Sequence, residues 1–164
     1  MAIEADGDIL LNGSVTVSQV KKLDMGLYID SANGRMEGSG TLTSGTSVIL
    51  LANGGIGTVN TPMKIKHGTK GSLTAVSTTG DVYVESMSNL LVNVVGGDYV
   101  SVKARGTIMG ATPQDDDHMH IIGSYVELNS TAYRIGTRVN PLRLYCNDGG
   151  VWGLNPNTMF FLFY

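Results

Sequence analysis

A ten-residue pattern occurs twice in this chain, at residues 56–65 and again at residues 135–144. The two copies read IGTVNTPMKI and IGTRVNPLRL, and they align without a gap. Each copy has Ile-Gly-Thr, three variable residues, a proline, and then a basic residue between two apolar residues. An internal repeat is typical of solenoid proteins, in which one structural unit is stacked on the next.

The repeat extends beyond this motif on both sides. Downstream, the same alignment continues without a gap and places residues 81–85 on residues 160–164. Upstream, the alignment needs one inserted residue, after which Val48 matches Val126. The unit contains several strand signals, so it predicts about three coils per repeat, at roughly 20 to 30 residues per coil.

The motif itself predicts one corner of the coil that is used twice. The chain should leave a face at the isoleucine, turn through the glycine and begin the next strand after the proline, which cannot donate to a strand ladder. Ile56 and Ile135 should then lie on the same face of the solenoid. At about 4.8 Å per coil, their Cα atoms should stand roughly 14 Å apart along the axis.

The remaining sequence predicts short strands and no helix. Gly occurs 22 times and charged residues make up only 15% of the chain, with Ser, Thr and Asn as filler, which disfavours helices. Apolar and polar residues alternate, which predicts strands with one buried face. The sequence therefore predicts an all-β fold, a parallel β-helix (β-solenoid) that spans residues 1–164 as a single segment. Its inward residues should include Val82, Val84, Val100, Val102, Val126 and Leu128.

The composition excludes several kinds of partner and site. The net charge is −3 and no basic cluster is longer than Lys21-Lys22, so nucleic acid is not an expected partner. No stretch reaches the roughly 18 apolar residues of a membrane span. The single cysteine, Cys146, excludes an internal disulfide and a Cys-based zinc site, and it should be a small core residue. The first residues lack a signal-peptide pattern, so the protein is either cytosolic or a segment from the middle of a longer exported chain, and we favour the second.

A series of motifs runs along the chain from GTIMG at 106–110, through VEL at 126–128, to NPL at 140–142. Together these motifs resemble the repeats of filamentous-haemagglutinin-like large exoproteins. The first copy departs from that pattern, because Thr61 stands before the proline instead of Asn and no acidic loop precedes Val48. The resemblance covers residues 48–164 and, weakly, the N-terminal third. It implies a right-handed parallel β-helix on an exported surface fibre, commonly an adhesin. The motifs are GTIMG at 106–110, DDD at 115–117, HIIG at 120–123, VEL at 126–128, IGT at 135–137 and NPL at 140–142.

The expected function is that of a non-catalytic stalk or adhesin segment, on the cell surface or secreted. Its expected partners are neighbouring coils of the same longer chain and a host-surface glycan or protein. One alternative is a β-helix polysaccharide lyase or hydrolase, which paired carboxylates on one solvent face would favour. Another is a trimeric phage fibre or tailspike segment. A face lined by Ser, Thr and Asn would favour the stalk.

The segment at residues 115–120, DDDHMH, is the one cluster with metal-ligand chemistry. Carboxylates could hold Ca²⁺, and His118 and His120 could join a transition-metal site. Alternate residues of a strand share a face whereas adjacent ones do not, so the groups cannot all converge. We therefore expect a solvated loop between coils, with no metal or cofactor.

No catalytic constellation is predicted elsewhere. His67 should be a surface histidine. Three aspartates, each after a glycine, should accept a backbone N–H at a coil corner in an Asx-turn. Three arginines cluster near the second motif without matching acidic partners. These residues are Asp8, Asp81 and Asp98, and Arg134, Arg138 and Arg143.

The C-terminal segment TMFFLFY at residues 158–164 is unusually apolar. Phe161 and Phe163 should point inward, and Phe160 and Leu162 outward. An open coil edge with such residues invites aggregation, so it should be covered by a further coil, a cap or another subunit. End-to-end self-association through the C-terminal coil is therefore expected.

Overall fold

The computed structural model describes residues 1–18, 26–111, 118–131, 134–138, 140–152 and 160–163, with the backbone alone for 148–152 and 160–163. Every regular element in these ranges is a strand. The strands are β1 (Ala2–Ala5), β2 (Ile9–Leu10), β3 (Val15–Val17), β4 (Leu27–Ser31), β5 (Met36–Glu37), β6 (Thr41–Ser44), β7 (Val48–Ala52), β8 (Met63–His67), β9 (Leu73–Ser77), β10 (Val82–Ser86), β11 (Leu90–Gly96), β12 (Tyr99–Ala104), β13 (Ile108–Gly110), β14 (Ile121–Ser130), β15 (Leu142–Trp152) and β16 (Phe160–Phe163). No helix among the described residues is long and apolar enough to cross a membrane.

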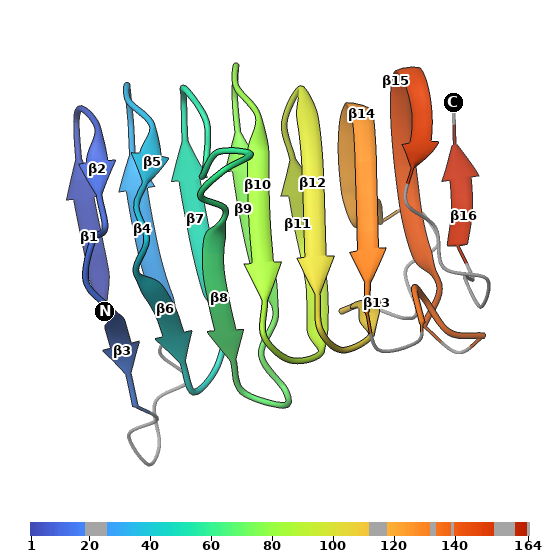
Figure 1. The fold of residues 1–164 in the computed structure, drawn as a ribbon, viewed down its shortest axis with the longest axis horizontal. Coiled ribbons are helices and arrows are strands. Elements are labelled where there is room, and N and C mark those ends of the chain that lie inside the picture. The colour runs from blue at the N-terminus through green and yellow to red at the C-terminus, as the bar shows by residue number, and fades with distance from the viewer. Residues whose placement is uncertain (19–25, 112–117, 132–133, 139, 153–159, 164) are drawn as a thin grey trace.

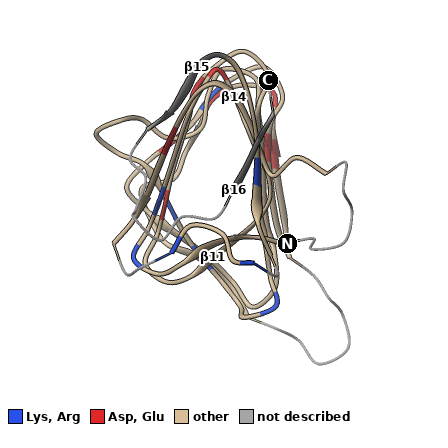
Figure 2. Ribbon diagram, turned by 90° about the vertical axis from the view of Figure 1, so that its right-hand side faces the viewer, with Lys and Arg blue, Asp and Glu red and all other residues tan. Residues whose placement is uncertain are grey.

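The strands form a β-solenoid in which the strand pairs of the described residues are all parallel (Figure 1). One stack runs β1, β4, β7, β9, β11 and β14, and a second runs β3, β6, β8, β10, β12 and β14. The long strand β14 belongs to both, and β15 and β16 follow it. Figure 2 looks along the solenoid and shows the coils superposed around a three-sided outline. The predicted parallel β-helix is confirmed.

The inward positions of the second stack form continuous apolar columns. Val82, Val100 and Val126 are parallel partners on three successive coils, and all three are fully buried. The neighbouring column, which is at most 1% exposed, consists of Val84, Val102 and Leu128. The predicted inward register is therefore confirmed for all six residues. The coils differ in length, since the coil from Val82 to Val100 is shorter than the next coil, from Val100 to Val126.

The repeat predicted the wrong coil spacing. Ile56 pairs with Val82, which pairs with Val100, which in turn pairs with Val126. Val126 therefore lies three coils above Ile56. Ile135 lies further along the chain than Val126 and pairs with Ile108 of β13, in a different line of strands from Ile56. The prediction that Ile56 and Ile135 share a face three coils apart is therefore wrong, because the repeat length exceeds three coils and ends part of the way around a fourth.

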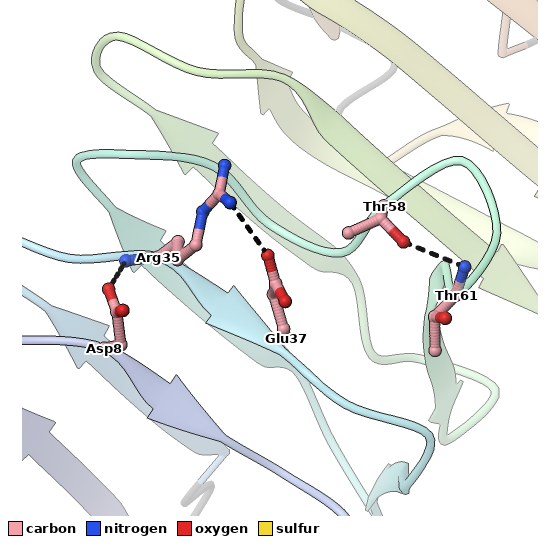
Figure 3. Close-up of polar contacts among 5 residues, drawn as sticks. All are labelled: Asp8, Arg35, Glu37, Thr58 and Thr61. Atoms are coloured by element: carbon pink, nitrogen blue, oxygen red, sulfur yellow. Dashed lines mark hydrogen bonds and ion pairs between the residues drawn. The ribbon is translucent and has the colours of Figure 1, made fainter.

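The two copies of the motif form the same local turn, but this turn is not the predicted corner between two faces. Ile56 and Met63 pair with Val82 and Val84 of the single strand β10, so residues 57–62 are a loop inserted within one face. Gly57 and Gly136 have φ of 67° and 70°, the left-handed region that glycine adopts most readily. In the first copy, Thr61 N–H donates to Thr58 Oγ1 at 3.0 Å (Figure 3), and in the second, Asn140 N–H donates to Thr137 Oγ1 at 2.9 Å. Strands β8 and β15 begin directly after the two prolines, as predicted.

Buried serines join successive coils at the ends of strands. Ser31 Oγ donates to the carbonyl of Gly7 at 2.8 Å, and Ser77 Oγ donates to the carbonyl of Asn53 at 3.1 Å. Each acceptor lies 24 residues earlier in the chain, one coil below. A hydroxyl buried in this way must be hydrogen-bonded, so each serine contributes an inter-coil bond from within the core.

Strand β16 lies against β15, with Phe160 beside Leu142 and Leu162 beside Leu144. Leu142 and Leu144 are buried. The predicted inward Phe161 and Phe163 and outward Phe160 and Leu162 concern side chains that lie outside the described part of the structure. The predicted alignment of residues 81–85 with 160–164 is wrong, because β16 continues the first stack and β10 belongs to the second.

Candidate functional site

The outer face of β10, β12 and β14 carries the densest group of functional side chains in the described part of the chain. The inward valines of these strands alternate with outward residues, so the outward residues also lie in register across three coils. Tyr83, Ser101 and Glu127 form one such row, and Tyr99 lies beside Tyr125 in the next. We call this surface the tyrosine–carboxylate face; it consists of Asp81, Tyr83, Glu85, Tyr99, Ser101, Lys103, Tyr125 and Glu127.

Two tyrosines of this face stack on each other and hold a carboxylate. The rings of Tyr83 and Tyr99 have centroids 5.6 Å apart and an interplanar angle of 27°. Glu127 Oε2 accepts a hydrogen bond from Ser101 Oγ at 2.8 Å and a longer one from the Tyr99 hydroxyl at 3.4 Å. Its other oxygen, Oε1, lies 3.7 Å from Lys103 Nζ. Glu127 is therefore oriented from three sides by groups on the adjacent strand.

Asp81 holds the other edge of the tyrosine pair. Its Oδ1 accepts the backbone N–H of Tyr99, one coil further on, at 3.1 Å. Its Oδ2 accepts the hydroxyl of Tyr83 at 3.2 Å. One carboxylate therefore fixes both the backbone of one tyrosine and the side chain of the other. The two rings are positioned by bonds between coils as well as by the strands that carry them.

Burial and the nearby carboxylates together raise the pKa of both phenols above their ordinary value. Burial is the largest cause for Tyr83, followed by the charge of Asp81 and its hydrogen bond. Burial is again the largest cause for the raised pKa of Tyr99, followed by the charge of Glu127. Both phenols thus lie in a negative potential that disfavours a further negative charge.

Stability should fall at alkaline pH through these tyrosines. A raised pKa means that the folded chain holds the phenol proton more tightly than the unfolded chain does. The contribution is therefore fully present below the ordinary phenol pKa, 10.0, and is lost as the pH rises through the higher folded value. We expect the melting temperature to fall above pH 10, and to fall less steeply in Tyr83→Phe. Thermal melts across this pH range test it, and parallel curves for the two proteins would refute it.

The predicted metal-ligand segment lies partly outside the described residues, which omit Asp115 to Asp117. His118 Nε2 lies 2.7 Å from the carbonyl oxygen of Asn93, and the His118 and His120 rings meet edge to face at 5.2 Å. His120 is buried, and its Nδ1 accepts the backbone N–H of Arg143 at 3.1 Å. Within the described ranges, no three His, Cys, Asp or Glu side chains are grouped to hold a metal ion.

His67 is more than a surface histidine, which corrects the prediction. It is half-buried, its Nδ1 lies 2.7 Å from the carbonyl oxygen of Gly68, and its Nε2 accepts the N–H of Leu91 at 3.2 Å. The second bond reaches the coil above. No single-residue pattern in the sequence could have indicated it, because the partner is a backbone group 24 residues away.

Two of the three predicted corner aspartates, Asp8 and Asp81, accept backbone N–H groups through their carboxylates, but across coils and not in local Asx-turns. Asp8 Oδ1 accepts the N–H of Arg35 at 2.9 Å, next to the Arg35–Glu37 ion pair (Figure 3). Asp81 does the same for Tyr99. Asp98 contributes its backbone carbonyl, which accepts the N–H of Ser124 at 2.8 Å. These bonds stabilise the stacking of one coil on the next.

The remaining candidate residues are dispersed or enclosed. Arg134 and Arg138 are exposed, whereas Arg143 is buried, so the three arginines do not form one basic surface. Cys146 is buried as predicted, and this burial raises the pKa of its thiol. A deep surface depression at one corner is lined by Gly45, Thr46, Ser47, Thr69, Lys70 and Gly71 and carries one charged side chain.

The sequence did not indicate the tyrosine–carboxylate face, although a signal for it was present. Once the inward valines of β10, β12 and β14 were placed, the residues between them had to point outward together. Their register across strands, which brings Tyr83 to Tyr99 and Ser101 to Glu127, depends on coil lengths that the repeat predicted wrongly. Comparison with protein-family models, curated proteins and solved structures finds no match, so the resemblance to exoprotein repeats remains a prediction.

Proposed function

We propose that this chain is a non-catalytic segment of an exported bacterial surface solenoid related to the filamentous-haemagglutinin-like exoproteins, and that it acts as a stalk or adhesin. The main support is that consecutive coils are hydrogen-bonded to each other along the strands and at the corners. Such stacking makes a rod whose outer side chains are displayed along its length. A rod of this kind suits projection and binding better than enclosure of a substrate.

The ends of the described rod favour neighbouring coils as partners. Strands β1 and β16 lie at opposite ends of Figure 1, and each pairs with one strand. Their outer edges carry backbone groups that a further parallel strand can pair with. We propose that adjacent coils of a longer chain, or a second copy placed end to end, cover these edges.

Export and adhesion can be tested on the full-length gene product. Antibodies raised against this segment should label intact cells that produce the protein, and beads coated with the purified segment should adhere to host cells more than albumin-coated beads do. Labelling that requires cell lysis would contradict export. Equal adherence of the two kinds of bead would contradict the adhesin role.

One observation favours an enzymatic alternative, a β-helix polysaccharide lyase or hydrolase. Asp81 and Glu127 both contact Tyr99, so two carboxylates share one solvent-facing sheet. Each is held by several bonds, and the tyrosines between them keep their protons at neutral pH because the pKa of both is raised. Proton abstraction from a sugar requires a free base. Carboxylates that already accept hydrogen bonds and tyrosines that keep their protons do not supply one.

We expect no turnover of polysaccharides. A panel of acidic and neutral polysaccharides incubated with the purified protein should yield neither unsaturated products nor new reducing ends. The matched variants Asp81→Asn and Glu127→Gln should be indistinguishable from the unaltered protein. Turnover that either substitution abolishes would overturn the non-catalytic proposal in favour of the enzyme.

A further inference from the structure

The tyrosine–carboxylate face presents aromatic surface to solvent over neighbouring coils. Tyr125 is 47% exposed and lies beside Tyr99, whose ring stacks on that of Tyr83. Aromatic rings are electrostatically negative on their faces, so exposed tyrosines attract cations, and the planar arginine guanidinium in particular stacks on them. The aromatic surface therefore favours a positively charged group over an anionic one.

The charges around the rings reinforce this preference. Three carboxylates on the face, from Asp81, Glu85 and Glu127, stand against Lys103. Lys64 of the neighbouring strand β8 lies beside Glu85, so the net charge including Lys64 is −1, and Asp81 and Glu127 carry the negative potential near the rings. Glu127 and Lys103 are both partly exposed at a separation of 3.7 Å, where water weakens their attraction. Burial is the largest cause of the raised pKa of Tyr99, and the charge of the adjacent Glu127 raises this pKa further.

We propose that this face binds a basic segment of a partner protein, whose arginine or lysine side chains lie over the tyrosines and pair with Asp81, Glu85 and Glu127. An anionic nucleic acid would be repelled, and a neutral glycan would use the rings without the charges. The face covers three strands at about 4.8 Å per step, an extent of roughly 10 Å, so it can take more than one basic side chain. Arginine suits it best, because one guanidinium can stack on a ring and donate to a carboxylate at once.

This inference rests on the proposed function in one respect: it names the class of ligand that the chain would recognise if it acts as an adhesin. The structure provides a matched control on another face. Tyr28 donates to Asp30 Oδ2 at 2.9 Å, which reproduces a single tyrosine–carboxylate pair. Tyr28 has no stacked ring partner among the described residues. A general attraction to the acidic chain would involve both sites alike.

Binding of labelled hexa-arginine to the purified protein, followed by fluorescence anisotropy at about 0.15 M salt, tests the proposal, with hexa-glutamate and a neutral oligosaccharide as comparison ligands. We expect saturable binding of hexa-arginine alone. Tyr125→Ala and Glu127→Gln should each weaken it about 2- to 5-fold, while Tyr28→Ala and Asp30→Asn leave it unchanged. Circular dichroism of each variant confirms that the fold is retained.

Three results would overturn the proposal. The first is no binding of hexa-arginine, and the second is equal weakening by the substitutions on both faces, which would indicate non-specific attraction. The third is Tyr125-dependent binding of the neutral oligosaccharide in place of the peptide, which would assign the face to glycans. Peptide binding without adhesion of coated beads would contradict the proposed adhesin role alone, and adhesion without peptide binding would contradict this inference alone.

Discussion

Replacing Leu73 with alanine is expected to lower the free energy of unfolding by about 2–5 kcal/mol. Leu73 is fully buried in the middle of the solenoid, with Val48 below it and Val92 above it as parallel partners. Neighbours on both sides are fixed by strand pairing, so they cannot move to fill the space that the leucine leaves. Chemical denaturation followed by circular dichroism measures the loss as a lower midpoint.

The control for this prediction is Leu10→Ala. Leu10 is 66% exposed, so its replacement removes the same atoms from a site that already faces water. Its effect should stay within about 0.5 kcal/mol. Because a solenoid is stabilised mainly by contacts between adjacent coils, Leu73→Ala is also expected to reduce cooperativity by weakening the middle of the array. Similar costs for the two substitutions would contradict the proposed core.

Replacing Gly57 with alanine is expected to destabilise the protein by about 1–3 kcal/mol from backbone strain alone. Gly57 has φ of 67°, and a Cβ atom there would stand 2.5 Å from the carbonyl oxygen of Tyr83 and 2.8 Å from the nitrogen of Met63. Both are backbone atoms of the solenoid wall, so relief requires movement of a coil and adds to the cost. The melting temperature of the variant provides the measurement.

Gly13→Ala serves as the matched control for Gly57→Ala. No atom lies within 4 Å of the position that its Cβ would take, and its φ is not in the left-handed range. We expect a change within about 0.5 kcal/mol. Gly136→Ala should resemble Gly57→Ala, because Gly136 has φ of 70° in the second copy of the same local turn. If alanine is tolerated equally at all three positions, the turn of the motif does not depend on glycine.

Much of the fold could be predicted because its signals are local. A strand with one buried face has a period of two, so the alternation around Val82 and Val84 identified the inward side chains without knowledge of any partner. The turn of the repeated motif was equally local, since a left-handed glycine, a threonine that accepts a backbone N–H and a proline before the next strand act within a few residues. The inward side chains and the strand that begins after each proline agree with the structure, but the motif is a loop within one face and not the predicted corner between two faces.

The number of coils between two similar segments, and their positions around the solenoid axis, could not be predicted from local sequence in the same way. Two loops with the same conformation have similar sequences wherever they lie around the axis, so the similarity around Ile56 and Ile135 does not show how many coils separate them. Coil length is set by the loops, which can lengthen without disturbing the stacked strands. Three coils above Ile56 the chain has reached only Val126, and Ile135, further along the chain, pairs with Ile108 in another line of strands.

The sequence by itself determined that the chain is all-β, which side chains enter the core and that a strand begins after the proline of each motif copy, because these depend on neighbours along the chain. The tertiary structure alone decided which outward side chains meet. Tyr83 stacks on Tyr99, and Ser101 donates to Glu127, only because coils of unequal length bring them into register. The physical reason is that a solenoid forms its surface between coils, at sequence separations that variable loops control.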